Sequence, residues 1–293
     1  MTDPLRYHMR FTPSELDAQY NLRTSRPDVD ATVIPEWARR SEAARRSLSG
    51  PRDIRYGRGE RQKLDVFRSD DPAAPTLVYF HGGYWQRGDK SLYSFLALPF
   101  VAAGVNVAVV GYDLCPAVTV TRIAAEAREA MAYLWRHGDD LGIARKRITV
   151  MGHSAGGHIT QMIMATDWPT HGADLSADLV AAGIPVSPLS YLEPVRLTEA
   201  INATVGMDAA EAEAQSPMTR HPPATDAPQM VVVGGAETAE FQRQAAIYVD
   251  AYATATRPIT LCTVPEVDHF DVINRLVDAS SPVFEQALTL IAR

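Results

Sequence analysis

The chain has 293 residues, 46% of them hydrophobic, and a formal net charge of −7, which suits one large domain with a sizeable core. The negative charge and the absence of a basic stripe exclude a typical nucleic-acid-binding protein. No stretch resembles a secretory signal or a membrane span, and two cysteines, Cys115 and Cys262, are too few for a disulfide framework, so we expect a cytoplasmic protein without a membrane partner.

Residues 1–50 predict a helical arm on a single domain that spans residues 1–293. Thr12-Pro13-Ser14-Glu15 is typical of a helix start, and a second helix is expected from Ile34 to Leu48. The arm has too few apolar residues to form its own core, so it should pack on a domain. That domain could belong to its own chain or to a neighbouring copy, so a homodimer stays open.

Beyond residue 50 the pattern changes to alternating strands and helices. Strands are predicted at 53–56, 63–67, 76–80, 105–110, 148–151, 180–186, 230–233 and 259–264, and helices at 92–103, 121–137, 158–165, 240–254 and 282–292. The first two strands flank a hairpin-like turn and should be antiparallel. The remainder predicts an α/β fold with a mostly parallel, doubly wound sheet.

Residues 187–228 interrupt this alternation. The segment contains many prolines and two short helical stretches, at 195–204 and 209–215, but no strand. So long a connection in a compact domain usually has a function, so we expect an insertion that acts as a cap or lid. The alternative is a loose surface excursion.

The strand at 148–151 leads into Gly152-His153-Ser154-Ala155-Gly156, and a helix follows. A serine between two glycines, after a strand and before a helix, is typical of the nucleophile elbow of the α/β-hydrolase fold. A Cβ at Gly152 or Gly156 should clash with the backbone of so sharp a turn. The motif is short, and a glycine-rich loop with an ordinary serine would look the same. The remainder of the chain must therefore discriminate between a nucleophile elbow and such a loop.

His81-Gly82-Gly83-Tyr84-Trp85 follows the strand at 76–80. In this fold, the loop after that strand supplies backbone amides to the oxyanion hole, together with the residue after the nucleophile. The expected donors are therefore the amides of Gly82, Gly83 and Ala155.

The fold also requires an acid and then a histidine, in that order, after the last two strands. His269 follows the last strand, and we predict that it is the general base. Glu237 follows the preceding strand and is preferred to Glu240, because an acid in the first turn of a helix is favoured for structural reasons. Asp268 and Asp271 are close to His269 along the chain, which makes them unusual partners without excluding them.

No metal-ligand spacing such as H-E-x-x-H or C-x-x-C is present, and no dinucleotide-binding glycine motif opens a helix, so no cofactor and no metal are expected.

Several of these motifs together resemble the serine-dependent kynurenine formamidases (arylformamidases). The resemblance extends over nearly the whole chain and is carried by residues 81–85, 112–116, 152–158, 237–244 and 268–270, and by Asp17-Ala18-Gln19-Tyr20-Asn21 in the arm. It implies a triad of Ser154, Glu237 and His269. Animal and fungal members have aspartate where this chain has Glu237, a carboxylate one methylene longer.

The resemblance implies a serine hydrolase that cleaves an aryl formamide like N-formylkynurenine, or a related amide or ester, through an acyl-enzyme. Its partner would be a small aromatic substrate, bound in a pocket walled by Tyr84, Trp85, Tyr191 and Phe270, although each of these could also be a core residue. The alternatives are a general short-chain carboxylesterase and a non-catalytic binding protein with the same fold.

Overall fold

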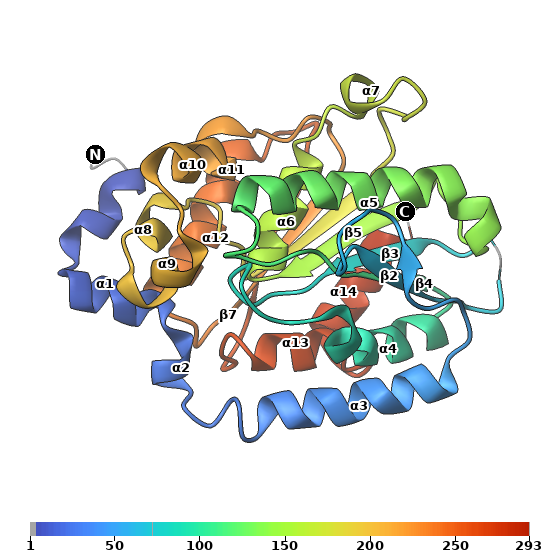
Figure 1. Ribbon diagram of the computed structural model, residues 1–293, viewed down its shortest axis with the longest axis horizontal. Helices are drawn as coiled ribbons and strands as arrows, with labels where there is room; N and C mark the ends of the chain where they lie inside the picture. Colours follow the sequence, from blue (N-terminus) through green and yellow to red (C-terminus); the bar gives the residue numbers. More distant parts are fainter. Residues whose placement is uncertain (1–3, 72, 293) are drawn as a thin grey trace.

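The computed structural model describes residues 4–71 and 73–292. Within them, one sheet has the strand order β1-β2-β4-β3-β5-β6-β7-β8 (Figure 1). The strands are β1 (Ile54–Arg55), β2 (Lys63–Phe67), β3 (Thr76–Phe80), β4 (Asn106–Val110), β5 (Ile148–His153), β6 (Ala182–Val186), β7 (Gln229–Gly234) and β8 (Ile259–Val264). The β1–β2 and β2–β4 pairs are antiparallel and the others are parallel, which confirms the predicted fold class.

Helices cover both faces of the sheet (Figure 1). One face packs against α5 (Val120–Leu141), α6 (Ala155–Met164) and α12 (Ala239–Tyr252), and the other against α3 (Val33–Ser47), α4 (Ala97–Ala102), α13 (Asp271–Leu276) and α14 (Pro282–Ile291). Successive residues of β3 alternate between the two cores: Val78 and Phe80 enter the first, and Leu77 and Tyr79 the second. Burial of the apolar side chains Leu77, Val78 and Phe80 contributes about 1.5–3 kcal/mol each relative to exposure.

The remaining helices differ from the predictions mainly at their boundaries. The expected helix at 92–103 is a 3₁₀ helix, η2 (Lys90–Leu96), followed by α4, whose third residue is Pro99. Proline has no amide hydrogen and is tolerated in the first turn of an α-helix, which suits a new start there. α5 extends to Leu141 and ends at Gly142, where φ is +68°. The short helix α7 (Trp168–His171) and α13 were not predicted.

The arm packs on the domain of its own chain. It consists of η1 (Pro4–Arg10), α1 (Pro13–Tyr20), α2 (Leu22–Ser25) and α3. The Thr12 side chain accepts a hydrogen bond from the Glu15 amide, and the Glu15 side chain accepts one from the Thr12 amide. The predicted start of α1 is therefore a capping box. The Tyr20 hydroxyl donates to Glu240 of α12 at 2.6 Å, and the Trp37 indole donates to Asn274 of α13 at 3.2 Å.

The insertion between β6 and β7 contains α8 (Glu193–Arg196), α9 (Glu199–Val205), α10 (Ala209–Ala214) and α11 (Pro217–Arg220), which lie beside α1 at one end of the molecule (Figure 1). Its residues Leu189, Leu192 and Val195 are fully buried in the core on the α6 side. The Gln161 side chain of α6 donates to the Ser190 hydroxyl at 2.9 Å. The insertion is therefore packed on the domain, which does not fit a loose excursion.

Candidate active site

The turn between β5 and α6 holds Ser154 in a rare backbone conformation, with φ +59° and ψ −117°. Such a conformation costs on the order of 1–3 kcal/mol in a residue other than glycine and occurs mainly at functional sites. A Cβ on Gly152 would lie 2.2 Å from the Gly156 carbonyl oxygen, and one on Gly156 would lie 2.0 Å from that of Phe80. No side chain larger than hydrogen fits at either glycine, as the motif predicted.

His269 and Glu237 form a buried pair. His269 Nδ1 lies 2.6 Å from Glu237 Oε2. The second carboxylate oxygen, Oε1, accepts hydrogen bonds from the Gly234 amide at 2.7 Å and from the Ser187 hydroxyl. These contacts hold the carboxylate in one orientation. Ser187 was missed by sequence reasoning, although it is the first residue after β6 and therefore lies at the carboxyl edge of the sheet.

The other acids considered for this role have different partners. Glu240 accepts from Tyr20 and pairs with Arg243 at 2.7 Å. The Asp268 side chain caps the backbone amides of Phe270 and Asp271 and binds Arg26 of the arm. The geometry therefore leaves Glu237 as the carboxylate on His269 Nδ1.

His153 supports His269 from the other side. The two rings lie 4.4 Å apart, and His153 Nε2 donates to the His269 carbonyl oxygen at 2.8 Å. Burial, and then the nearby charge of His269, lower the pKa of His153 well below its usual value. His153 therefore stays neutral at pH 7 and acts as a hydrogen-bond donor to the loop that carries His269.

The loop after β3 approaches the serine closely. A Cβ on Gly82 would lie 3.2 Å from Ser154 Cβ and 2.9 Å from the His153 carbonyl oxygen, so only glycine allows this contact. Gly83, Tyr84 and Trp85 all have positive φ, at +115°, +49° and +56°. The Arg87 amide donates to the Gly83 carbonyl at 3.1 Å and closes this coil. The structure thus brings Gly82, Ser154 and Ala155 together.

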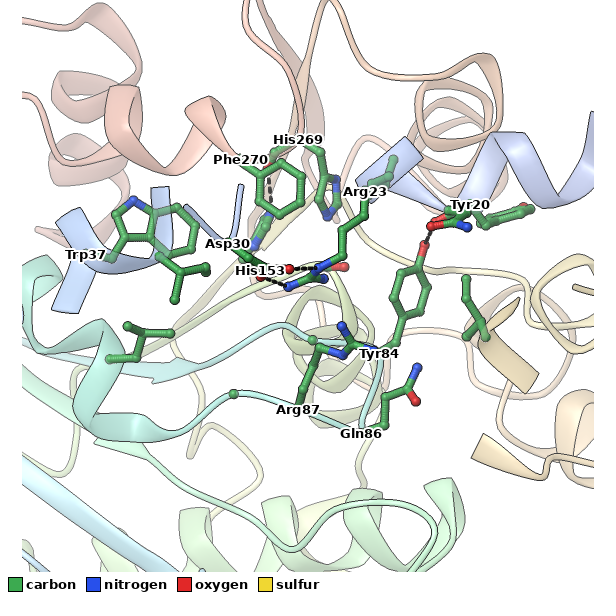
Figure 2. A pocket seen from close by; sticks show the side chains of 18 of the residues that line it. Tyr20, Arg23, Asp30, Trp37, Tyr84, Gln86, Arg87, His153, His269 and Phe270 are labelled. Atoms are coloured by element: carbon green, nitrogen blue, oxygen red, sulfur yellow. Dashed lines mark hydrogen bonds and ion pairs between the residues drawn. The ribbon is translucent and has the colours of Figure 1, made fainter. Parts of the chain in front are cut away.

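A cavity of about 290 Å³ lies in front of Ser154 (Figure 2). Six segments line it: the arm, the loop after β3, η2, the turn between β5 and α6, the insertion, and the loop around His269. The lining residues are Tyr20, Asn21, Leu22, Arg23, Asp30, Ile34, Trp37, Gly83, Tyr84, Gln86, Arg87, Gly88, Leu92, Tyr93, His153, Ser154, Ala200, Ile201, His269 and Phe270.

Comparisons with known proteins agree with this architecture. The chain is 32% identical to a solved structure from Silicibacter sp. TM1040 with a proposed thioesterase activity, with a TM-score of 0.76 over 90% of this chain and 94% of that one. It is similar to the kynurenine formamidase of Danio rerio, at 29% identity over 95% of this chain and 96% of the relative. The BD-FAE family model matches residues 64–177. The chain belongs to the α/β-hydrolases.

The same fold occurs in esterase B from Lactobacillus rhamnosis, at 18% identity and a TM-score of 0.68. The identity to the Danio rerio relative, over 95% of this chain, confirms the expected resemblance of this α/β-hydrolase to kynurenine formamidases.

The pocket wall of this α/β-hydrolase differs from the predicted one. Tyr84 and Phe270 line the cavity. Trp85 is fully buried and packs edge-on against His158, because the coil with positive φ turns it into the core. Tyr191 lies instead in a second cavity, between η1 and the insertion.

The contribution of the arm to the pocket was missed. Tyr20, Asn21, Arg23, Asp30 and Trp37 line the cavity from a segment that precedes Ser154 by more than a hundred residues. The only sequence signal was Asp17-Ala18-Gln19-Tyr20-Asn21, whose last two residues reach the cavity.

The described part of this α/β-hydrolase contains no cluster of three or more His, Cys, Asp or Glu side chains that could hold a metal ion. Within residues 4–71 and 73–292, no helix has the length and apolar character that crossing a membrane requires.

Proposed function

We propose that this hydrolase cleaves an aryl formamide through a formyl-enzyme on Ser154. The observation that carries the proposal is the buried His269–Glu237 pair, 2.6 Å apart, in a cavity that a serine on a strained turn also lines. A serine, a histidine and a carboxylate are together the groups that activate a hydroxyl for acyl transfer.

In the first step His269 accepts the Ser154 proton while Oγ bonds to the formyl carbon. Glu237 stabilises the imidazolium that forms, and the amides of Gly82, Gly83 and Ala155 stabilise the negative charge on the oxygen. His269 then protonates the leaving aryl amine as the C–N bond breaks. Water, deprotonated by His269, releases formate and restores the serine.

The cavity supports an aromatic leaving group. Trp37, Tyr84, Tyr93 and Phe270 contribute ring surface to a volume of about 290 Å³, which suits a single-ring substrate. The Danio rerio relative is named a kynurenine formamidase, which favours the formamide.

The second candidate is a short aryl ester. The proposed thioesterase activity of the Silicibacter relative, at 32% identity, favours cleavage of a better leaving group than an amine. The same serine, histidine and amides would act in both reactions.

Steady-state hydrolysis of N-formylkynurenine and phenyl acetate discriminates between the two candidates. We expect a higher kcat/KM for the formamide. Comparable rates on both would identify a general esterase, and no turnover of the formamide would end the formamide proposal.

Ser154→Ala tests the nucleophile. We expect loss of kcat by roughly three or more orders of magnitude, with an unchanged thermal midpoint, because the hydroxyl forms the acyl bond. Ser14→Ala, an exposed position on α1, is the matched control. Activity that survives Ser154→Ala would refute the site assignment.

A further inference from the structure

The cavity contains three charged side chains that the proposed chemistry does not use: Arg23, Asp30 and Arg87. Arg23 donates two hydrogen bonds to the Asp30 carboxylate, from Nε at 2.9 Å and from Nη2 at 2.7 Å. Figure 2 shows Arg23 reaching into the pocket from the arm with Asp30 beside it, and Arg87 rising from the loop that carries Tyr84. Among residues 4–71 and 73–292, none forms an ion pair or hydrogen bond with the Arg87 guanidinium.

These three groups leave one unbalanced positive charge in the cavity. The hydrogen bonds from Arg23 lower the pKa of Asp30, so its carboxylate is ionised at pH 7. Burial, and then the charge of Arg23, lower the pKa of Arg87, while the charge of Asp30 raises it. An arginine nevertheless stays protonated in a protein. Two cations and one carboxylate sum to +1, in a chain whose net charge is −7.

Glu237, the acid of the expected triad, cannot neutralise this charge directly. Among the described residues that line the cavity, Asp30 is the only one with a carboxylate. Glu237 lies behind the His269 ring, where His269, Gly234 and Ser187 occupy its oxygens.

We propose that Arg87, backed by the Arg23–Asp30 pair, binds a carboxylate that the substrate carries away from its scissile carbonyl. The proposal rests on the proposed function only for the reacting end of the substrate. A planar guanidinium fork matches a carboxylate with two parallel hydrogen bonds, and the Arg23–Asp30 contact displays that geometry in the same cavity. The single excess charge matches a single carboxylate.

The position of Arg87 relates the proposed binding of the carboxylate to the reaction at Ser154. Its amide donates to the Gly83 carbonyl, so Arg87 ends the short coil that begins at the expected oxyanion donors. A Cβ on Gly83 would lie 2.3 Å from the Arg87 carbonyl oxygen, which shows how tightly this coil is packed. A carboxylate held by Arg87 would therefore orient the carbonyl relative to Gly82 and Gly83.

Two matched ligands test the proposal without any turnover: 4-(2-aminophenyl)-4-oxobutanoate and its primary amide. They have nearly the same size and differ in one charge. By calorimetry with the wild-type protein, we expect the acid to bind about tenfold more tightly than the amide.

Two substitutions should move this acid-to-amide ratio in opposite directions. Arg87→Gln removes the unpaired cation, so the ratio should fall toward one. Asp30→Asn removes the competing carboxylate and frees Arg23, so the ratio should rise. The control is Arg39→Gln, which removes a positive charge from the same arm but lies outside the cavity, exposed and paired with Glu36; it should leave the ratio unchanged.

Equal binding of acid and amide by the wild type would overturn the proposal, as would no measurable binding of the acid at millimolar concentration or an equal loss in Arg87→Gln and Arg39→Gln. Failure of the proposed function looks different: N-formylkynurenine would not be cleaved, while the acid-to-amide ratio and its response to the variants would persist.

Discussion

At the scale of single residues, the candidate site depends on how few orientations each group can adopt. Ser154 is fixed by two glycines that no other residue can replace, and Glu237 by an amide and a hydroxyl on one oxygen. Glutamate is longer than aspartate by one methylene and has one more rotatable bond. The hydrogen bonds to Glu237 Oε1 restrict the rotation that this extra bond allows. Oε2 is thereby directed at His269.

Glu237→Gln should lower kcat by roughly two to four orders of magnitude with a smaller effect on KM, because an amide cannot stabilise the imidazolium as a carboxylate does. Steady-state kinetics on the best substrate measures this effect. Glu285→Gln, at an exposed position on α14, is the matched control. A fall of less than about tenfold would assign the orienting role to another group.

At the scale of elements, the arm is part of the site rather than an appendage. It lines the cavity, and its Arg26 binds carboxylates on both sides of His269: Asp268, and Asp271 at 2.9 Å. The Asp268 side chain in turn caps the first turn leading into α13. The arm therefore fixes the loop that carries the expected general base.

Arg26→Met should lower kcat by about tenfold, because a loop that has lost its bridging cation holds the base less accurately, and small misplacements of reacting groups are costly. The measurements are kcat, KM and the thermal midpoint. Arg46→Met is the control, since Arg46 is an exposed arginine of the same arm whose partner, among the residues the structure describes, is Glu42 within α3. Equal kcat values for the two variants would contradict this role of the arm.

At the scale of the whole molecule, the two cores enclose three neutral histidines. Burial is the largest cause that lowers the pKa of His81 to about 4, that of His158 to about 4, and that of His153 well below its usual value. In the unfolded chain each should titrate near its ordinary value of about 6.5.

The free energy of unfolding should therefore fall as the pH drops below about 6.5. Above that pH both states hold these rings neutral, and the histidines contribute no pH dependence. Below that pH the unfolded chain binds protons at these histidines, whereas the folded chain keeps them neutral. The free energy of unfolding therefore falls by up to about 1.4 kcal/mol per pH unit for each histidine. For His81 and His158 the loss levels off near pH 4, where the folded state is protonated too.

Urea unfolding at pH 7.5, 6.5 and 5.5 measures this slope. His158→Gln should reduce the slope by about one proton, whatever its effect on stability at a fixed pH. Identical slopes for the wild type and His158→Gln would contradict the assignment.

The sequence by itself determined the features that depend on local sterics and periodicity. The glycines of the elbow follow from a turn too sharp for a Cβ, and the doubly wound sheet follows from strands buried on both faces. The positions of Glu237 and His269 follow from the order of the strands, since the carboxyl ends of parallel strands meet at one edge. The length and the prolines of residues 187–228 predicted an insertion between two strands, and four short helices occupy it.

Only the tertiary structure decided the wall of the pocket, because contacts across long sequence separations leave no periodic trace. Consecutive aromatic residues in the coil after β3 diverge: Tyr84 lines the cavity, whereas Trp85 is buried in the core. Arg23 and Asp30 reach the cavity because α1 packs against α12 and Leu22 of α2 is buried in the core. The elbow at Ser154 could therefore be predicted from the sequence. The charged side chains of the cavity could not, because they depend on how the N-terminal arm, far from Ser154 along the chain, packs on the domain.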